Sequence, residues 1–167
     1  MDQAFVILGI LRDGWRNKLS DKFSISVDIE DRLMHIRVWG FWCLDEAHKY
    51  RKELSRAMDV LGEDDPWNVI ADVRLFPVQP APVQKIHSEL MRRALQMGMA
   101  KAANIVGGRL TRIQIEKLAL SAWPEKGHFN FFSNLKDAEA WLKGGESGHS
   151  GGEDKGNIQS FRHAGQS

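Results

Sequence analysis

Two short runs of alternating apolar and polar residues near the start of the chain constrain the fold more than any other feature. The first run covers residues 23–29 and the second covers 34–38. Side chains alternate between the two faces of a β-strand, so each run predicts a strand with one buried face. The acidic pair Glu30-Asp31 between the runs predicts a turn, and Gly40 ends the second strand. We therefore expect an antiparallel β-hairpin.

Beyond the hairpin the chain alternates between helical and strand patterns. Four segments carry apolar residues at three- or four-residue steps, which is typical of amphipathic helices. These segments are 44–61, 83–97, 111–122 and 134–142. Three mostly apolar runs between them predict buried strands, and these runs are 67–73, 102–106 and 129–132. The order β-β-α-β-α-β-α-β-α with right-handed crossovers predicts an α/β fold, a mixed sheet with a parallel centre and helices packed on it.

Two of the predicted helices begin with recognisable capping residues. Thr111 and Gln114 have the spacing of a capping box, in which each side chain binds a free backbone amide of the other residue. Asn134 and Asp137 have similar spacing before the last helix. We expect these residues to form the first turns of the third and fourth helices.

The beginning of the chain is apolar. Residues 4–11 form an apolar run of eight residues, whereas a membrane-spanning helix needs about 20. We expect residues 1–22 to form an N-terminal apolar arm that packs on the domain, on a partner or on a second copy. The alternative is a weak peripheral membrane contact through 4–18, with Trp15 and its basic neighbours at the lipid headgroups.

The end of the chain has a different composition. Residues 144–167 are rich in glycine and serine, and Ile158 and Phe161 are their only large apolar residues. Such a segment cannot bury enough apolar surface to offset the entropy lost on ordering. We expect a disordered tail there and a folded domain at 23–143.

Overall composition excludes several classes of protein. The 23 basic and 22 acidic residues give a net charge of +1, so we expect no nucleic-acid partner. Cys43 is the only cysteine, which excludes an intramolecular disulfide and a multi-cysteine metal site and fits a reducing cytoplasm. Residues 23–72 hold six basic and eleven acidic residues, whereas 84–126 hold eight and three. This contrast would favour head-to-tail self-association or docking of an acidic partner, unless the two sets are the solvated faces of different helices.

Three passages resemble a known family. They are the hairpin that ends in Trp39-Gly40 before a helix, the strand VIADVR at 69–74, and the ending FNFFSNLKDAEAWL at 129–142. With the order of elements, they resemble the STAS fold of bacterial anti-sigma-factor antagonists, over about three quarters of the chain. More narrowly, they resemble small bacterial proteins of that fold without an established reaction. The resemblance implies a regulatory domain that binds another protein.

The loop after the central strand departs from the antagonist pattern. The resemblance implies a serine or threonine at the start of the following helix, where a partner kinase phosphorylates it. Asp72 stands where the strand-ending aspartate of the family would be, but residues 74–84 contain no serine or threonine. Ser88 is more than a turn into the helix and lies beside Glu89. We therefore expect the phosphoswitch to be absent.

Two apolar features are the candidate binding surface. One is the loop after the central strand, which prolines restrict to few shapes, and the other is an aromatic cluster between the hairpin and the first helix. The aromatic cluster could equally pack beneath the N-terminal arm. His87 lies one residue from the core stripe of its helix, so we interpret it as a satisfied, partly buried histidine rather than a catalytic base. The candidate binding residues are Leu75, Phe76, Val78, His87, Trp39, Phe41 and Trp42.

No pattern in the sequence predicts catalysis. Asp72 and Arg74 are expected to form a structural ion pair rather than a ligand contact. Gly107-Gly108-Arg109 lacks the longer glycine pattern and the lysine of a P-loop. We expect no enzyme, cofactor or metal site, but a regulatory or protein-interaction module of STAS type. The alternative is binding of a small apolar, lipid-like ligand, because the plan of the fold also resembles that of the lipid-binding CRAL-TRIO domains.

Overall fold

The computed structural model describes residues 21–123 and 128–144. The predictions for the N-terminal arm and the C-terminal tail concern residues that lie almost entirely outside these ranges. Along the described chain the elements are β1 (Phe23–Asp28), β2 (Leu33–Trp39), α2 (Leu44–Leu61), β3 (Trp67–Leu75), α3 (Ala81–Gln96), β4 (Met99–Ile105), α4 (Arg109–Ala122), β5 (Phe129–Phe132) and α5 (Leu135–Leu142). The predicted order of strands and helices is confirmed.

The strands form one mixed sheet in the order β1-β2-β3-β4-β5. β1 and β2 are antiparallel, with Ile25 opposite Ile36, and this is the predicted hairpin. β3, β4 and β5 each run parallel to the preceding strand. The parallel centre follows from the helical crossovers, because a helix between two strands returns the chain to the same end of the sheet.

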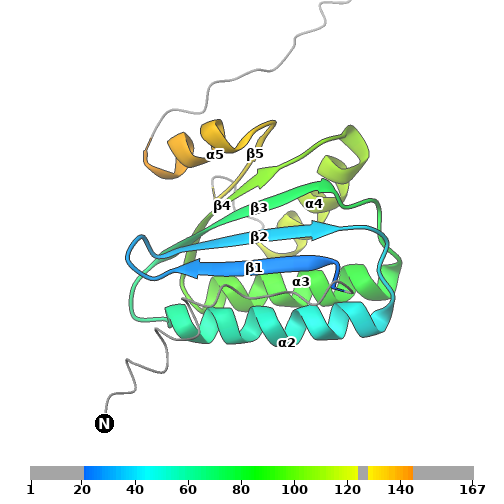
Figure 1. The fold of residues 1–167 in the computed structure, drawn as a ribbon, viewed down its shortest axis with the longest axis horizontal. Helices are drawn as coiled ribbons and strands as arrows, with labels where there is room; N and C mark the ends of the chain where they lie inside the picture. The colour runs from blue at the N-terminus through cyan, green and yellow to red at the C-terminus, as the bar shows by residue number, and fades with distance from the viewer. Residues whose placement is uncertain (1–20, 124–127, 145–167) are drawn as a thin grey trace, which may run out of the picture.

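Helices cover the sheet unequally on its two faces. α2 and α3 lie side by side on one face and α5 lies on the other (Figure 1). The larger core lies between the inner face of the sheet and α2, α3 and α4, and includes Met34, Val69 and Leu90. A smaller cluster around Ile70 and Ala138 lies beneath α5. Among the described residues, no helix is both long and apolar enough to cross a lipid bilayer.

The boundary between α3 and β4 differs from the prediction. α3 ends at Gln96 and β4 begins at Met99, three residues before the predicted strand. Trp67 explains the earlier start, because it pairs with Met99 in the parallel ladder and its indole Nε1 donates a hydrogen bond of 2.7 Å to the Met97 carbonyl. Gly98 has a φ of +93°, a conformation in which glycine is favoured and which permits the sharp reversal.

The predicted capping box of α4 is wrong. The N-cap residue is Gly108, so Thr111 and Gln114 lie inside the helix and are buried. Both side chains instead bind the loop that follows β3. The predicted cap of α5 is confirmed, since the Asn134 side chain accepts a hydrogen bond of 2.9 Å from the Asp137 amide.

Candidate functional site

The candidate site lies at the edge of the sheet where β2 and β3 end. Residues 39–43 leave β2 and residues 76–80 leave β3, and the two segments run beside each other. The Gly40 amide donates a hydrogen bond of 2.9 Å to the Leu75 carbonyl and starts this contact. The first turn of α4 borders the same loop, because the Thr111 hydroxyl donates a hydrogen bond of 3.0 Å to the Phe76 carbonyl.

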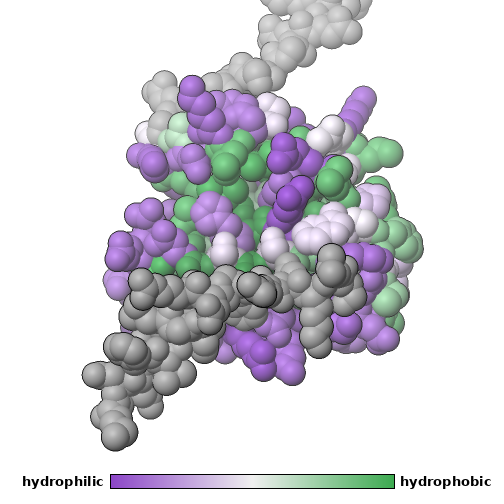
Figure 2. Space-filling model, viewed as in Figure 1, coloured by the Kyte–Doolittle hydropathy of each residue, from purple (hydrophilic) through white to green (hydrophobic). Residues whose placement is uncertain are grey.

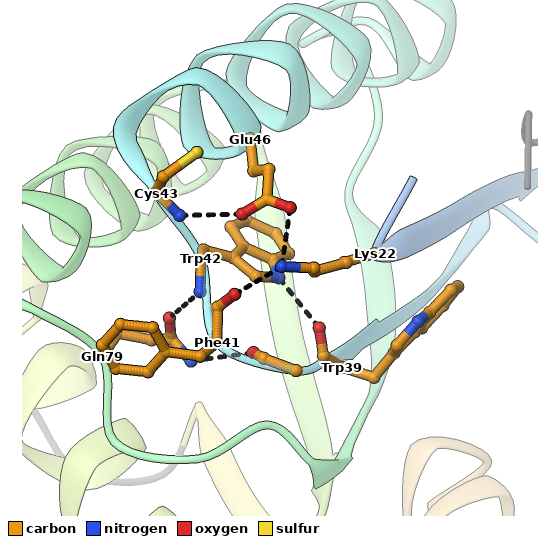
Figure 3. A network of polar contacts seen from close by, with 8 residues as sticks. Lys22, Trp39, Phe41, Trp42, Cys43, Glu46 and Gln79 are labelled. Atoms are coloured by element: carbon orange, nitrogen blue, oxygen red, sulfur yellow. Dashed lines mark hydrogen bonds and ion pairs between the residues drawn. The ribbon is translucent and has the colours of Figure 1, made fainter. Parts of the chain in front are cut away.

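The buried side chain of Gln79 joins the two segments. Its Oε1 accepts a hydrogen bond of 2.9 Å from the Trp42 amide, and its Nε2 donates to the carbonyls of Gly40 and Pro77 at 3.1 and 2.9 Å. Figure 3 shows the side chain of Gln79 between the two chain segments. The backbone N–H of Gln79 also donates a hydrogen bond of 2.7 Å to Oε1 of Gln114, which joins the loop to α4. The loop is therefore fixed by hydrogen bonds from both sides.

A second set of polar contacts fixes the start of α2. Lys22 Nζ donates a hydrogen bond of 2.6 Å to the Phe41 carbonyl and forms an ion pair of 2.7 Å with Glu46. Glu46 in turn accepts a hydrogen bond of 2.7 Å from the Cys43 amide, which satisfies a free donor at the N-terminus of the helix (Figure 3). The backbone that carries Phe41 is thus held independently of the Phe41 side chain.

The structure divides the predicted binding residues into an exposed set and a buried set. Phe41, Leu75 and Val78 are exposed, with fractions between 47% and 63%. Leu110, in the first turn of α4, is 71% exposed and was missed by the sequence analysis. We call these four residues the apolar end surface. Figure 2, drawn from the same side as Figure 1, shows apolar residues at the right-hand edge, where β2 and β3 end.

The expectation that Phe76 and Trp42 belong to an exposed surface is wrong. Phe76 is 1% exposed and Trp42 is 0% exposed. The Phe76 amide donates a hydrogen bond of 3.1 Å to the Val73 carbonyl, a turn that directs Phe76 inward directly after the exposed Leu75. The two rings meet at an edge-to-face angle, with centroids 5.1 Å apart. They belong to the core.

Trp39 lies apart from Trp42 and is half-buried on the outer face of the sheet. Figure 3 shows its side chain pointing away from that of Trp42. The guanidinium of Arg37 lies 5.9 Å from the centre of the Trp39 ring. The Trp39 carbonyl accepts a hydrogen bond of 2.9 Å from the Trp42 indole. The aromatic cluster expected from the sequence is therefore split between surface and core.

The ion pair predicted between Asp72 and Arg74 is present. Arg74 donates through Nε and Nη2 to the two carboxylate oxygens of Asp72, at 2.9 and 2.8 Å. These hydrogen bonds lower the pKa of Asp72 below its ordinary value. Gly107 lies against this part of the chain, because a Cβ on it would stand 3.0 Å from the Arg74 carbonyl oxygen. Close packing of the backbone therefore explains this glycine.

His87 lies beneath the site, on the inner side of α3. It is 8% exposed, and its ring is surrounded by those of Trp42, Tyr50 and Phe76, with centroids 5.2 to 5.3 Å away. Burial lowers the pKa of His87 to about 4, so the imidazole is neutral at pH 7. The expectation of a satisfied histidine is wrong, because Nε2 has no hydrogen-bond partner among the described residues.

His87 lines a cavity of about 80 Å³ between the inner face of the sheet and helices α2 and α3. Most of the lining is aliphatic or aromatic, and among the described residues no charged side chain lines it. The described residues also contain no group of three or more histidines, cysteines, aspartates or glutamates able to hold a metal ion. The arrangement can therefore hold an apolar group beside the neutral imidazole of His87.

No protein-family model and no curated protein matches the sequence. Solved structures that resemble the fold include the following two. One is an uncharacterized protein of the DUF3478 family with a SpoIIAA-like fold from Shewanella loihica PV-4, with a TM-score of 0.58, 17% identity and 75% of this chain covering 98% of that chain. The other is an anti-sigma factor antagonist from Mycobacterium paratuberculosis, with a TM-score of 0.51, 16% identity and 76% of this chain covering 99% of that chain. The fold is STAS-like, as the sequence predicted.

Proposed function

We propose that this chain is a non-catalytic regulatory module of STAS type that binds a protein partner through the apolar end surface. One observation carries the proposal: exposed apolar side chains stand on a loop that buried hydrogen bonds hold rigid. A rigid loop loses less conformational entropy on binding than a flexible one. Exposed apolar clusters on soluble domains mark contact sites more often than chance. A similar fold in an anti-sigma factor antagonist supports this choice.

Cross-linking at a defined position tests this proposal. A photo-reactive amino acid is placed at Leu75 in cells that naturally make the protein, and at Val60 as a matched control. Val60 is similarly exposed, but it lies near the far end of α2 from the surface. We expect one defined protein to be captured from position 75 and not from position 60, and Phe41→Ser to reduce this capture. The same products at both positions would contradict the proposal.

We also propose that the module lacks the phosphoswitch of the antagonists and works in the cytoplasm. Residues 76–80 contain no hydroxyl side chain, and Gln79 within this loop is buried. The nearest serine in α3, Ser88, shares a hydrogen bond of 2.9 Å with Ser121. Incubation with ATP and an antagonist kinase should leave the intact mass unchanged. A stoichiometric phosphate within 74–88 would refute this part of the proposal.

A second candidate function is the binding of a small apolar ligand. It is favoured by the cavity beneath α2 and α3, and by the lining residue His87, whose buried Nε2 has no hydrogen-bond partner among the described residues. Native mass spectrometry of freshly purified protein tests it directly. A co-purifying mass that is lost on organic extraction supports this function. Its absence from every preparation, together with no binding of added apolar compounds, refutes it.

A further inference from the structure

We propose that the cavity binds an uncharged apolar molecule that carries one hydroxyl group, and that this hydroxyl hydrogen-bonds to Nε2 of His87. This inference rests on the second candidate function and specifies its ligand. The proposal starts from the position of the imidazole. His87 is on α3, its side chain faces the cavity, and aromatic rings restrict its orientation.

The unpartnered Nε2 of His87 indicates that the ligand carries a polar group. A buried polar atom is normally hydrogen-bonded, because burial removes its contacts with water. Two other nitrogen groups on the lining have partners within the protein: Trp67 Nε1 donates to the Met97 carbonyl, and Asn104 Nδ2 lies 3.4 Å from the carbonyls of Ala102 and Asn130. Nε2 of His87 is a fully buried side-chain atom, and the described residues supply no hydrogen-bond partner for it.

The lining determines the charge of the ligand. Among the described residues no Asp, Glu, Lys or Arg side chain lines the cavity, so a carboxylate or ammonium would be buried without a counter-charge, which is strongly unfavourable. His87 is itself neutral and cannot supply one at pH 7. A hydroxyl matches a neutral imidazole because it can donate to the bare nitrogen or accept from the protonated one.

The volume of the cavity limits the size of the bound group. The cavity measures about 80 Å³, whereas an engineered apolar cavity that holds benzene measures about 150 Å³. The bound group is therefore small, such as the end of an aliphatic chain. Methionine side chains can change rotamer to admit a longer chain. The methionines on the lining are Met34, Met58, Met91 and Met99.

The test uses three probes of similar length with different ends: 1-hexanol, 1-chloropentane and hexanoate. Each is titrated at pH 7 into the full-length protein, and binding is measured by calorimetry. The ring nitrogens of His87 are followed in two-bond ¹H–¹⁵N spectra, a readout that a purely structural role would not change. The His87→Phe variant keeps an aromatic ring but removes Nε2. His48→Phe makes the same change at an exposed position on α2 and serves as the matched control.

We expect 1-hexanol to bind the wild type and to shift the Nε2 resonance of His87. Loss of one neutral hydrogen bond should weaken 1-hexanol binding about fivefold in His87→Phe, while 1-chloropentane binding stays within about twofold. Hexanoate should bind more weakly than 1-hexanol. His48→Phe should bind all three probes like the wild type.

Different failures identify which proposal is wrong. Equal binding of 1-hexanol and 1-chloropentane with an unchanged Nε2 resonance overturns the inference and leaves the cavity as a general apolar site. Tighter binding of hexanoate overturns the uncharged ligand. No binding of any probe overturns the inference, and together with the absence of a co-purifying mass it also overturns the second candidate function. The resonance of the wild type decides the question even where His87→Phe does not fold.

Discussion

Lowering the pH should destabilise the protein through one buried histidine. The folded structure lowers the pKa of His87 from an ordinary 6.5 to about 4. Below pH 6.5 the unfolded chain takes up a proton that the folded protein does not take up until about pH 4. The unfolded state is therefore favoured progressively as the pH falls through this window. Above pH 6.5 both states are neutral and the effect disappears.

The size of the effect follows from these two pKa values. Each pH unit inside the window changes the free energy of unfolding by about 1.4 kcal/mol. Between pH 7.5 and pH 4.5 the loss amounts to about 2.5 kcal/mol, a large share of the roughly 5–15 kcal/mol by which domains are stable. Asp72 has a lowered pKa from its hydrogen bonds with Arg74. Its contribution is lost mainly below pH 3.8, outside the assay range.

Urea unfolding followed by tryptophan fluorescence measures this loss. The midpoint for the wild type should fall by roughly 1–2 M between pH 7.5 and pH 4.5. His87→Phe is the matched variant, because phenylalanine fits among the rings of Trp42, Tyr50 and Phe76 and does not titrate. Its midpoint should change much less over the same range. Parallel losses in wild type and variant would refute the assignment of the effect to His87.

Three further predictions concern the sheet edge. Phe76→Ser should lower the free energy of unfolding by about 3–5 kcal/mol, since it empties a fully buried site, and a change below 1 kcal/mol in urea unfolding would contradict its place in the core. Leu75→Ser changes the exposed residue before Phe76. It should change the free energy of unfolding by no more than about 0.5 kcal/mol while reducing partner capture. Gln79→Leu should cost about 2 kcal/mol or more, because the Trp42 amide and the Gly40 carbonyl lose their buried partner; wild-type stability of this variant would show that water replaces the side chain.

The sheet could be predicted because its signals are local. Alternation at 23–29 and 34–38 determines which side chains of β1 and β2 are buried, and the hairpin pairs neighbours in sequence. The apolar runs of β3 and β4 predict strands covered on both faces, as the structure shows. Only the ends of some strands and helices differ from the prediction. Met99 belongs to β4 because Trp67 pairs with it from a strand 32 positions earlier, a contact that no local pattern contains.

The site was predicted less well because its polar contacts join distant segments. Thr111 and Gln114 have the spacing of a capping box, but their partners are the Phe76 carbonyl and the Gln79 amide, 35 residues away in each case. These two backbone groups are buried and have no water to bind, whereas water can satisfy the free amides at an exposed helix end. Hydrogen bonds to the loop therefore stabilise the fold more than a local cap would. Phe76 is likewise buried because of the turn in which its amide binds the Val73 carbonyl. The apolar composition of the loop does not indicate which of its side chains turns inward. Leu110 was a recoverable omission, because it lies off the buried stripe of α4.

The two candidate functions use neighbouring residues with opposite orientations. Phe41 and Leu75 face outward, while the next residue in each segment, Trp42 and Phe76, faces inward and contacts the ring of His87. A substitution at an inward position therefore disturbs the cavity and the apolar end surface together and cannot separate the two functions. Substitutions at Leu75 and at His87 can separate them, because the Leu75 side chain is mostly exposed and the His87 side chain is buried. If the Leu75 substitution reduces partner capture and leaves 1-hexanol binding unchanged, partner binding depends on the surface alone. If the His87 substitution weakens 1-hexanol binding and leaves partner capture unchanged, ligand binding depends on the cavity alone.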